Sequence, residues 1–131
     1  MDVEKISRHL QVSLPDVLAI YLFGSYASGA FEAHSDLDVA VLLTSKADPV
    51  SLWRLSGELA DIAGIPVDLV DLGAASTVFQ HQVLTKGQCL WARDSSVGLF
   101  EAFVLSEKTS LDAARAGLLE DIQEEGMVHG R

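Results

Sequence analysis

The sequence predicts an α/β (α+β) fold, a small mixed β-sheet flanked by helices with a long C-terminal helix, in a single domain over 1–131. Apolar runs at 17–23, 37–43 and 66–72 alternate with segments whose apolar residues have helical spacing. Strands that alternate with helices indicate a sheet with helices packed on it. Hydrophobic residues make up 49% of the 131 residues, which is enough to bury a real core.

The first half of the chain begins with a short helix over 2–11, predicted by apolar residues three and four apart. The continuous apolar run 17–23 is typical of a strand buried on both faces. Gly24 and Ser25 end this run, and 25–30 is predicted to form a short helical turn. A loop then leads to the second strand, 37–43.

A second helix is predicted from Pro49 to about Ala63. Asp48 is suited to cap its N-terminus, proline is favoured at the first helical position, and Gly64 supplies the stop. The predicted buried stripe of this helix is Leu52, Leu55, Leu59 and Ile62.

The second half continues with a third strand over 66–72 and a helix from Ala74 to about Leu84. Lys86 and Gly87 are predicted to turn the chain into a short fourth strand, 88–93. Asp94 or Ser95 can cap a final helix that extends over about 95–125. The predicted apolar stripe of that helix is Val97, Phe100, Phe103, Val104, Leu111, Leu118, Leu119 and Ile122.

Composition and charge exclude several classes of function and location. The net charge of −10 disfavours nonspecific binding to nucleic acid, so no direct nucleic-acid partner is expected. No apolar run approaches the length of a membrane span, and the N-terminus shows no secretory signal. The single cysteine, Cys89, excludes an internal disulfide and is expected to be a small core residue. A cytoplasmic protein without membrane contact is the expectation.

The chemistry-bearing pattern is Gly24-Ser25, then ten residues, then Asp36-x-Asp38 at the start of an apolar strand. Residues two apart on a strand point the same way, and two adjacent carboxylates repel unless a cation lies between them. A Gly-Ser turn after a strand can bring backbone N–H groups and a hydroxyl close to an anion. Ordinary turn residues are the alternative, but a charge at Asp38 inside an apolar strand is expensive without a partner. The pattern therefore favours a metal-bound phosphate, most simply a nucleoside triphosphate with Mg²⁺.

Metal-dependent phosphoryl or nucleotidyl transfer usually needs a third acidic group. Asp68 and Asp71 both lie in the third predicted strand, but residues three apart face opposite sides, so only one can join the pair. We favour Asp68, in mid-strand, because Asp71 near the strand end can simply be solvated. Lys46, Arg54 and Arg93 are candidates to neutralise a triphosphate, although surface solvation or a salt bridge is the default explanation for each.

Residues 22–43 together with Asp68 resemble the nucleotidyltransferase superfamily related to DNA polymerase β. The segment from Leu84 through Gly87, Leu90, Trp91 and Arg93 to Asp94 extends the resemblance to the minimal nucleotidyltransferases. The resemblance implies the nucleotidyltransferase fold. It also implies that Asp36 and Asp38 bind two Mg²⁺ ions with the triphosphate of ATP. Asp68 would ligate one metal and help deprotonate the acceptor hydroxyl, and Gly24 and Ser25 would hold the outer phosphates.

Proteins of this short type often pair with a HEPN ribonuclease toxin and act as its antitoxin by transferring AMP to a toxin tyrosine. The resemblance therefore implies a protein adenylyltransferase with a HEPN-type toxin as partner. Two alternatives remain open: transfer to a small molecule such as an aminoglycoside, and neutralisation of the toxin by binding alone. Many relatives have Arg where Ser28 stands here, so one phosphate contact is expected to be missing.

Overall fold

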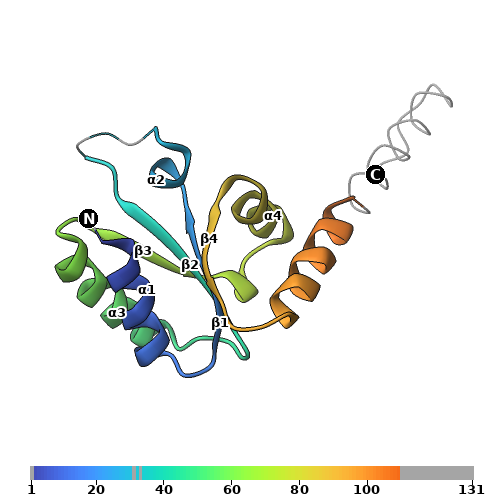
Figure 1. Cartoon of the computed structure of the whole chain (residues 1–131), viewed down its shortest axis with the longest axis horizontal. Coiled ribbons are helices and arrows are strands. Elements are labelled where there is room, and N and C mark those ends of the chain that lie inside the picture. The colour runs from blue at the N-terminus through green and yellow to red at the C-terminus, as the bar shows by residue number, and fades with distance from the viewer. Residues whose placement is uncertain (1, 31, 33, 110–131) are drawn as a thin grey trace, which may run out of the picture.

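The computed structural model describes residues 2–30, 32 and 34–109, and its centre is a four-stranded sheet with helices on both faces (Figure 1). The elements in chain order are α1 (Val3–Ser13), β1 (Val17–Phe23), α2 (Ser25–Ser28), β2 (Leu37–Leu43), α3 (Pro49–Ala63), β3 (Val67–Asp71), η1 (Leu72–Ala74), α4 (Thr77–Lys86) and β4 (Gln88–Ala92). A further helix follows β4 and occupies 96–109 of the described chain. The prediction of a mixed sheet flanked by helices is confirmed.

The sheet has the order β3-β2-β1-β4. β1 pairs antiparallel with both β2 and β4, whereas β2 pairs parallel with β3. The parallel pair requires a crossover, which α3 provides. The C-terminal end of β1 thus lies beside the N-terminal ends of β2 and β3, and all three meet at one end of the sheet (Figure 1).

One face of the sheet is covered by α1 and α3. Alternate residues of the strands point to this face because side chains in a strand alternate in direction. Leu55 and Leu59 of α3 and Ile6 and Leu10 of α1 complete this core. The cluster consists of Ile6, Leu10, Val17, Ile20, Leu22, Leu37, Val39, Val41, Leu43, Leu55, Leu59 and Leu69. His9 and Glu58, 2.7 Å apart, join the two helices at the surface.

The other face is covered by α4 and the C-terminal helix. Its buried residues are Ala19, Tyr21, Ala40, Leu42, Leu72, Val83 and Val97. Phe23, Phe79 and Phe100 pack against them while remaining partly exposed. This second core is smaller, and a cavity lined by Phe23 and Phe79 adjoins it at one end of the sheet.

The predicted helix boundaries of α3 are confirmed. The Asp48 carboxylate accepts hydrogen bonds from the backbone N–H and the hydroxyl of Ser51, and Pro49 occupies the first helical position. Gly64 ends the helix with φ +76°, a value that glycine adopts without steric cost. The helix predicted from Ala74 to about Leu84 is less accurate. The 3-10 helix η1 ends at Ala74, and α4 begins only at Thr77 and extends to Lys86.

Four burial predictions are wrong or only partly right. Cys89 is exposed because β4 is an edge strand. Phe103 is 62% exposed and Ile62 is 36% exposed, since the helices turn these positions away from the sheet. Leu52 is only partly buried. The C-terminal half of the last predicted helix, including Leu111, Leu118, Leu119 and Ile122, lies outside the described residues.

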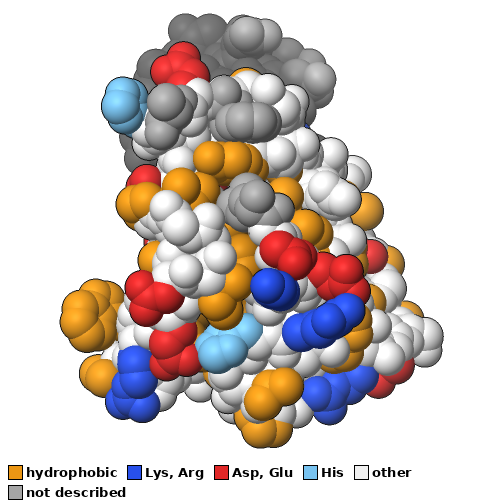
Figure 2. Space-filling model, turned by 60° about the vertical axis from the view of Figure 1, so that its left-hand side comes forward, with side chains coloured by type: hydrophobic (Ala, Val, Ile, Leu, Met, Phe, Trp, Pro, Cys, Tyr) orange, Lys and Arg blue, Asp and Glu red, His pale blue; other side chains and the backbone are white. Residues whose placement is uncertain are grey.

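Figure 2 looks onto the side of the molecule that carries α1 and α3, where basic side chains gather among acidic and apolar ones. Lys5 and Arg8 of α1 and Arg54 of α3 are exposed. Several of the few basic side chains of this acidic chain therefore lie on the face opposite to α4.

In the described ranges, no helix combines the length and the apolar character needed to cross a bilayer.

Candidate active site

Gly24 ends β1 and packs directly against Asp38. A Cβ atom built on Gly24 would lie 2.1 Å from Oδ2 of Asp38 and 3.0 Å from its Cγ. The φ of Gly24 is +73°, in the left-handed region that favours glycine. Both constraints require glycine at this position. The motif therefore folds back on itself, with its Gly-Ser turn in contact with its second aspartate.

Asp38 and Asp68 lie side by side. They are register partners on the parallel strands β2 and β3, so their side chains share the face of the sheet that carries α4. Asp36 precedes Asp38 by two residues, just before β2 begins, and is exposed. The structure thus places all three predicted carboxylates at one end of the sheet.

The carboxylates influence one another electrostatically. The pKa of Asp38 is raised above its ordinary value, first by partial burial and then by the negative charges of Asp68 and Asp36. Like charges are held close here at a cost in stability, which is typical of sites that bind a cation or move a proton.

The donor set consists of oxygen ligands, which suits Mg²⁺. In the described residues, no three acidic, histidine or cysteine side chains converge closely enough to form a ready-made metal cage. Mg²⁺ does not need such a cage, because it is commonly held by one or two carboxylates together with substrate phosphates and waters. The carboxylates at 36, 38 and 68 therefore fit a metal that arrives with its nucleotide.

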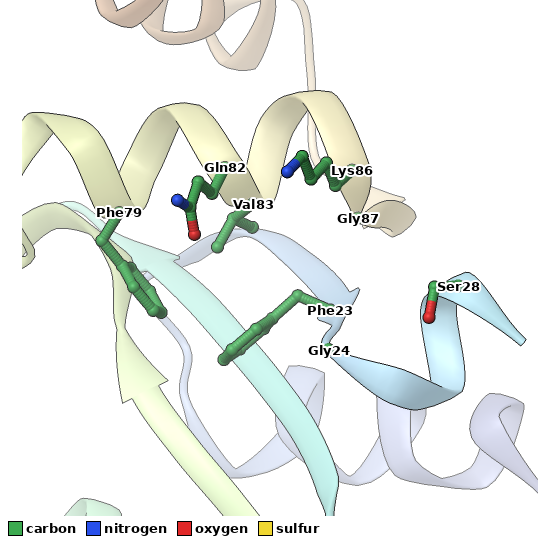
Figure 3. Close-up of a pocket in the computed structure, with 8 residues that line it drawn as sticks. All are labelled: Phe23, Gly24, Ser28, Phe79, Gln82, Val83, Lys86 and Gly87. Carbon is green, nitrogen blue, oxygen red and sulfur yellow. The ribbon is translucent and has the colours of Figure 1, made fainter. Parts of the chain in front are cut away.

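A cavity of about 330 Å³ adjoins Gly24. Figure 3 shows it between α4, which contributes Phe79, Gln82, Val83 and Lys86, and the end of β1 with Phe23 and Gly24, while Ser28 and Gly87 complete its lining. The rings of Phe23 and Phe79 meet edge to face with their centroids 5.3 Å apart. The cavity thus combines aromatic surface, polar groups and a position next to the carboxylates, as a nucleotide site requires.

Other predicted candidates lie elsewhere. Asp71 faces away from Asp68, and its carboxylate accepts a hydrogen bond of 3.0 Å from the backbone N–H of Ala47, a loop contact. Lys46 lines a separate hollow beside Asp71. The Arg93 guanidinium donates to the carbonyl of Pro15 at 2.6 Å. Arg54 is exposed on α3.

The sequence does not predict a site role for Phe23 of β1 or for three cavity residues of α4, Phe79, Gln82 and Lys86. The segment of α4 carries the last three at helical spacing, and Gln82 and Lys86 are four residues apart, which places two polar side chains on one face of the helix. That spacing is a weak signal, since polar pairs of this kind are common on solvated helices.

The sequence is similar to known nucleotidyltransferases, which agrees with a site built from three carboxylates. The sequence profile of the family described as "Polymerase beta, Nucleotidyltransferase" matches residues 4–96. Protein adenylyltransferase MntA of Shewanella oneidensis is 38% identical over 122 residues, covering 93% of this chain and 88% of that protein. An aminoglycoside (3'') (9) adenylyltransferase of Klebsiella pneumoniae is 34% identical over 61 residues, covering 47% of this chain and 22% of that enzyme.

The fold is also similar to chains in solved structures of toxin–antitoxin complexes. A chain in the crystal structure of a toxin–antitoxin with AMP-PNP is 37% identical, with a TM-score of 0.82 over 94% of this chain and 99% of its own. A chain in the structure of tri-AMPylated Shewanella oneidensis HEPN toxin in complex with MNT antitoxin is 37% identical, with a TM-score of 0.73 over 92% of this chain and 94% of its own. The chain therefore belongs to the polymerase β-type nucleotidyltransferase family and is a homologue of the protein adenylyltransferase MntA.

Proposed function

We propose that the chain is a Mg²⁺-dependent protein adenylyltransferase that acts as an antitoxin by transferring AMP from ATP to a hydroxyl, most simply a tyrosine, of a HEPN-type toxin. The observation that carries the proposal is the set of carboxylates at one end of the sheet, with Asp38 beside Asp68 and in contact with Gly24. Similarity to MntA over 93% of the chain supports the protein acceptor.

The three aspartates hold the metal in this proposal. Asp36 and Asp38 supply carboxylate oxygens from the start of β2, and Asp68 supplies one from β3. Bound Mg²⁺ ions, two by family resemblance, would polarise the α-phosphate and neutralise charge on the leaving pyrophosphate. The repulsion among the carboxylates is relieved when cations bind between them.

The reaction is a displacement at the α-phosphorus of ATP. The acceptor hydroxyl oxygen forms a bond to that phosphorus, and the bond to the bridging oxygen of pyrophosphate breaks. Asp68 receives the hydroxyl proton, because it is the exposed member of the adjacent pair and can meet an acceptor from solvent. Asp38 is half-buried against Gly24, which suits a fixed ligand better than a proton carrier.

In this proposal ATP occupies the cavity beside Gly24, between α4 and the β1–α2 turn. The Phe23–Phe79 pair offers aromatic surface to the nucleoside. Gly24 and Ser25 approach the outer phosphates, since the absence of a side chain at Gly24 permits close contact. The α-phosphate then lies between the cavity and the carboxylates.

Transfer of label tests the proposal. The protein is incubated with Mg²⁺, a candidate HEPN-type toxin from its own source, and ATP labelled at either the α- or the γ-phosphate. Label from the α-phosphate is expected on the toxin, and label from the γ-phosphate is not. Asp68→Asn should abolish transfer, whereas Asp71→Asn is the matched control, because the asparagine oxygen can still accept the hydrogen bond from Ala47.

Each alternative function has its own outcome. Label on an aminoglycoside but not on the toxin would identify a small-molecule adenylyltransferase. Neutralisation of the toxin that survives Asp36→Ala with Asp38→Ala, without label transfer by the wild-type protein, would identify an antitoxin that acts by binding alone.

A further inference from the structure

We propose that Lys86 holds the outer phosphates of the bound nucleoside triphosphate and supplies the cavity with positive charge from the last turn of α4. The assignment rests on the proposed function, since it presupposes that a nucleotide occupies the cavity. Lys86 lies outside the Gly24–Asp38 motif, and in this proposal it is the residue by which the cavity distinguishes a nucleoside triphosphate from a monophosphate.

Among the described residues, Lys86 is the one cation that lines the cavity. The cations on α1 and α3 lie on the opposite face, Lys46 lines another hollow, and Arg93 binds the Pro15 carbonyl. Ser28, on the α2 side, brings a hydroxyl that donates to the Ser25 carbonyl at 3.2 Å and no charge. Positive charge at this cavity therefore depends on Lys86.

Lys86 also lacks an acidic partner in the part of the chain that the structure describes, where the ion pairs are Arg8–Glu4 and His9–Glu58. Lys5, Lys46 and Arg54 have no ion pair there either, so what distinguishes Lys86 is that it lines this cavity. An exposed ammonium at the mouth of a cavity, with no carboxylate to neutralise it, is available to an anion.

The position of Lys86 is fixed by the residue that follows it. A Cβ atom on Gly87 would lie 2.4 Å from the carbonyl oxygen of Val83 and 2.7 Å from that of Leu22. The end of α4 is thus packed against the end of β1, two residues before Gly24. This close packing holds the backbone of Lys86 beside the end of β1, on the α4 side of the cavity that Gly24 lines from β1 (Figure 3).

Nucleotide titration tests the assignment. Dissociation constants for AMP-PNP with Mg²⁺ and for AMP are measured by calorimetry on the full chain and on Lys86→Met, Lys86→Arg and Lys5→Met. Lys86→Met should weaken AMP-PNP binding roughly tenfold, as expected for a charge-assisted contact with phosphate. AMP binding should not change, because AMP lacks the outer phosphates. Lys86→Arg, which keeps the charge, and Lys5→Met, on α1, should bind AMP-PNP like the wild type.

Three outcomes would overturn the assignment. Equal AMP-PNP affinity in Lys86→Met and wild type would remove Lys86 from the site and leave the proposed function intact. Equal weakening of AMP and AMP-PNP, or a lower unfolding temperature as the sole effect, would assign Lys86 to the stability of the end of α4. Absence of AMP-PNP binding by the wild-type chain would overturn the proposed function, and Lys86 with it.

Discussion

Gly24 and Gly29 flank the short helix α2, and both have a left-handed φ, +73° and +79°. They differ in their surroundings, because a Cβ at Gly24 would overlap Asp38 whereas one at Gly29 would meet nothing within 4 Å. Gly24→Ala is therefore expected to displace the Asp38 carboxylate and to reduce AMP transfer at least roughly a hundredfold, in line with small misplacements at reactive centres. Transfer to the toxin and thermal unfolding are measured together.

Gly29→Ala is the matched control for backbone strain. Each alanine carries the cost of a left-handed φ, about 1 kcal/mol, in the free energy of unfolding. Transfer should survive in Gly29→Ala. If both variants lose transfer to the same extent, the strain of the α2 turn explains the effect and the contact with Asp38 does not.

Asp38 illustrates the stability cost of a site built from like charges. Asp38→Asn removes one of three neighbouring negative charges, so it should abolish transfer while raising the free energy of unfolding at pH 7 by about 1 kcal/mol. Mg²⁺ should raise the unfolding temperature of the wild type more than that of Asp38→Asn. Asp61→Asn, at an exposed position of α3, should change neither quantity.

The increase in the free energy of unfolding that is expected for Asp38→Asn should grow as the pH rises. The pKa of Asp38 is raised in the folded protein by burial and by Asp68 and Asp36. An acid with a raised folded pKa destabilises the fold only when it is ionised, so the penalty begins as pH rises above the ordinary value of about 4 and is complete above the folded pKa. At pH values below both, wild type and Asp38→Asn should unfold alike, and an undiminished difference there would contradict the electrostatic explanation.

At the scale of the elements, the end of α4 is the contact on which the cavity depends. Gly87→Ala places a methyl group against two carbonyl oxygens, those of Val83 and Leu22, so α4 must move away from β1. We expect a loss of about 2 kcal/mol in the free energy of unfolding, typical of overpacking, together with weaker nucleotide binding. Chemical unfolding and AMP-PNP titration measure the two effects.

Gly57→Ala is the control for a glycine in or beside a helix. Gly57 lies within α3 with open space around its Cα, so alanine should stabilise the protein by about 0.5–1 kcal/mol without changing nucleotide affinity. A Gly87→Ala variant as stable as the wild type would show that α4 tolerates displacement from β1.

Elements with strong local signals were predicted to the residue. Gly24 follows the end of β1, Pro49 begins α3 and Gly64 follows its end, while the bounds of β2 are those of an uninterrupted apolar run. The start of α4 was misplaced because η1 interrupts the segment, and the cap is Ser76, whose hydroxyl accepts the Phe79 N–H at 3.2 Å. A serine among small residues gives no unique cap position, so the choice depends on packing.

The candidate site likewise has a part that the sequence predicts, the carboxylates, and a part that depends on tertiary packing, the cavity. Strand periodicity predicts that Asp36 and Asp38 share a face and that only one of two further aspartates can join them. The mid-strand position favours Asp68, and the register places it beside Asp38. The cavity was not found, since α4 reaches β1 only through tertiary packing at Gly87. The exposure of Cys89 and Phe103 likewise depends on which strand lies at the edge and how the last helix is rotated. Catalytic roles for the three aspartates stay predictions until the variants are measured.

At the scale of the whole molecule, the two cores share one sheet but differ in how they are closed. The core under α1 and α3 is closed by aliphatic packing. The core under α4 and the C-terminal helix includes a polar connection, in which the buried Tyr21 hydroxyl donates to Oε2 of Glu101 at 2.9 Å across 80 residues of sequence. Burial, and then Glu101, raise the pKa of Tyr21, so the hydroxyl remains a donor at every physiological pH.

Tyr21→Phe tests how much this connection stabilises the packing of the C-terminal helix on the sheet. The variant keeps the ring in place and loses one hydrogen bond to a charged group, so we expect the free energy of unfolding to fall by about 1–2 kcal/mol. The unfolding temperature should fall by about 4–7 °C, as for domains of this size. AMP transfer should persist, because Tyr21 lies outside the cavity lining. Glu101→Gln keeps an acceptor oxygen and should lose less stability, and an equal loss in the two variants would assign the effect to the Glu101 charge instead of the hydrogen bond.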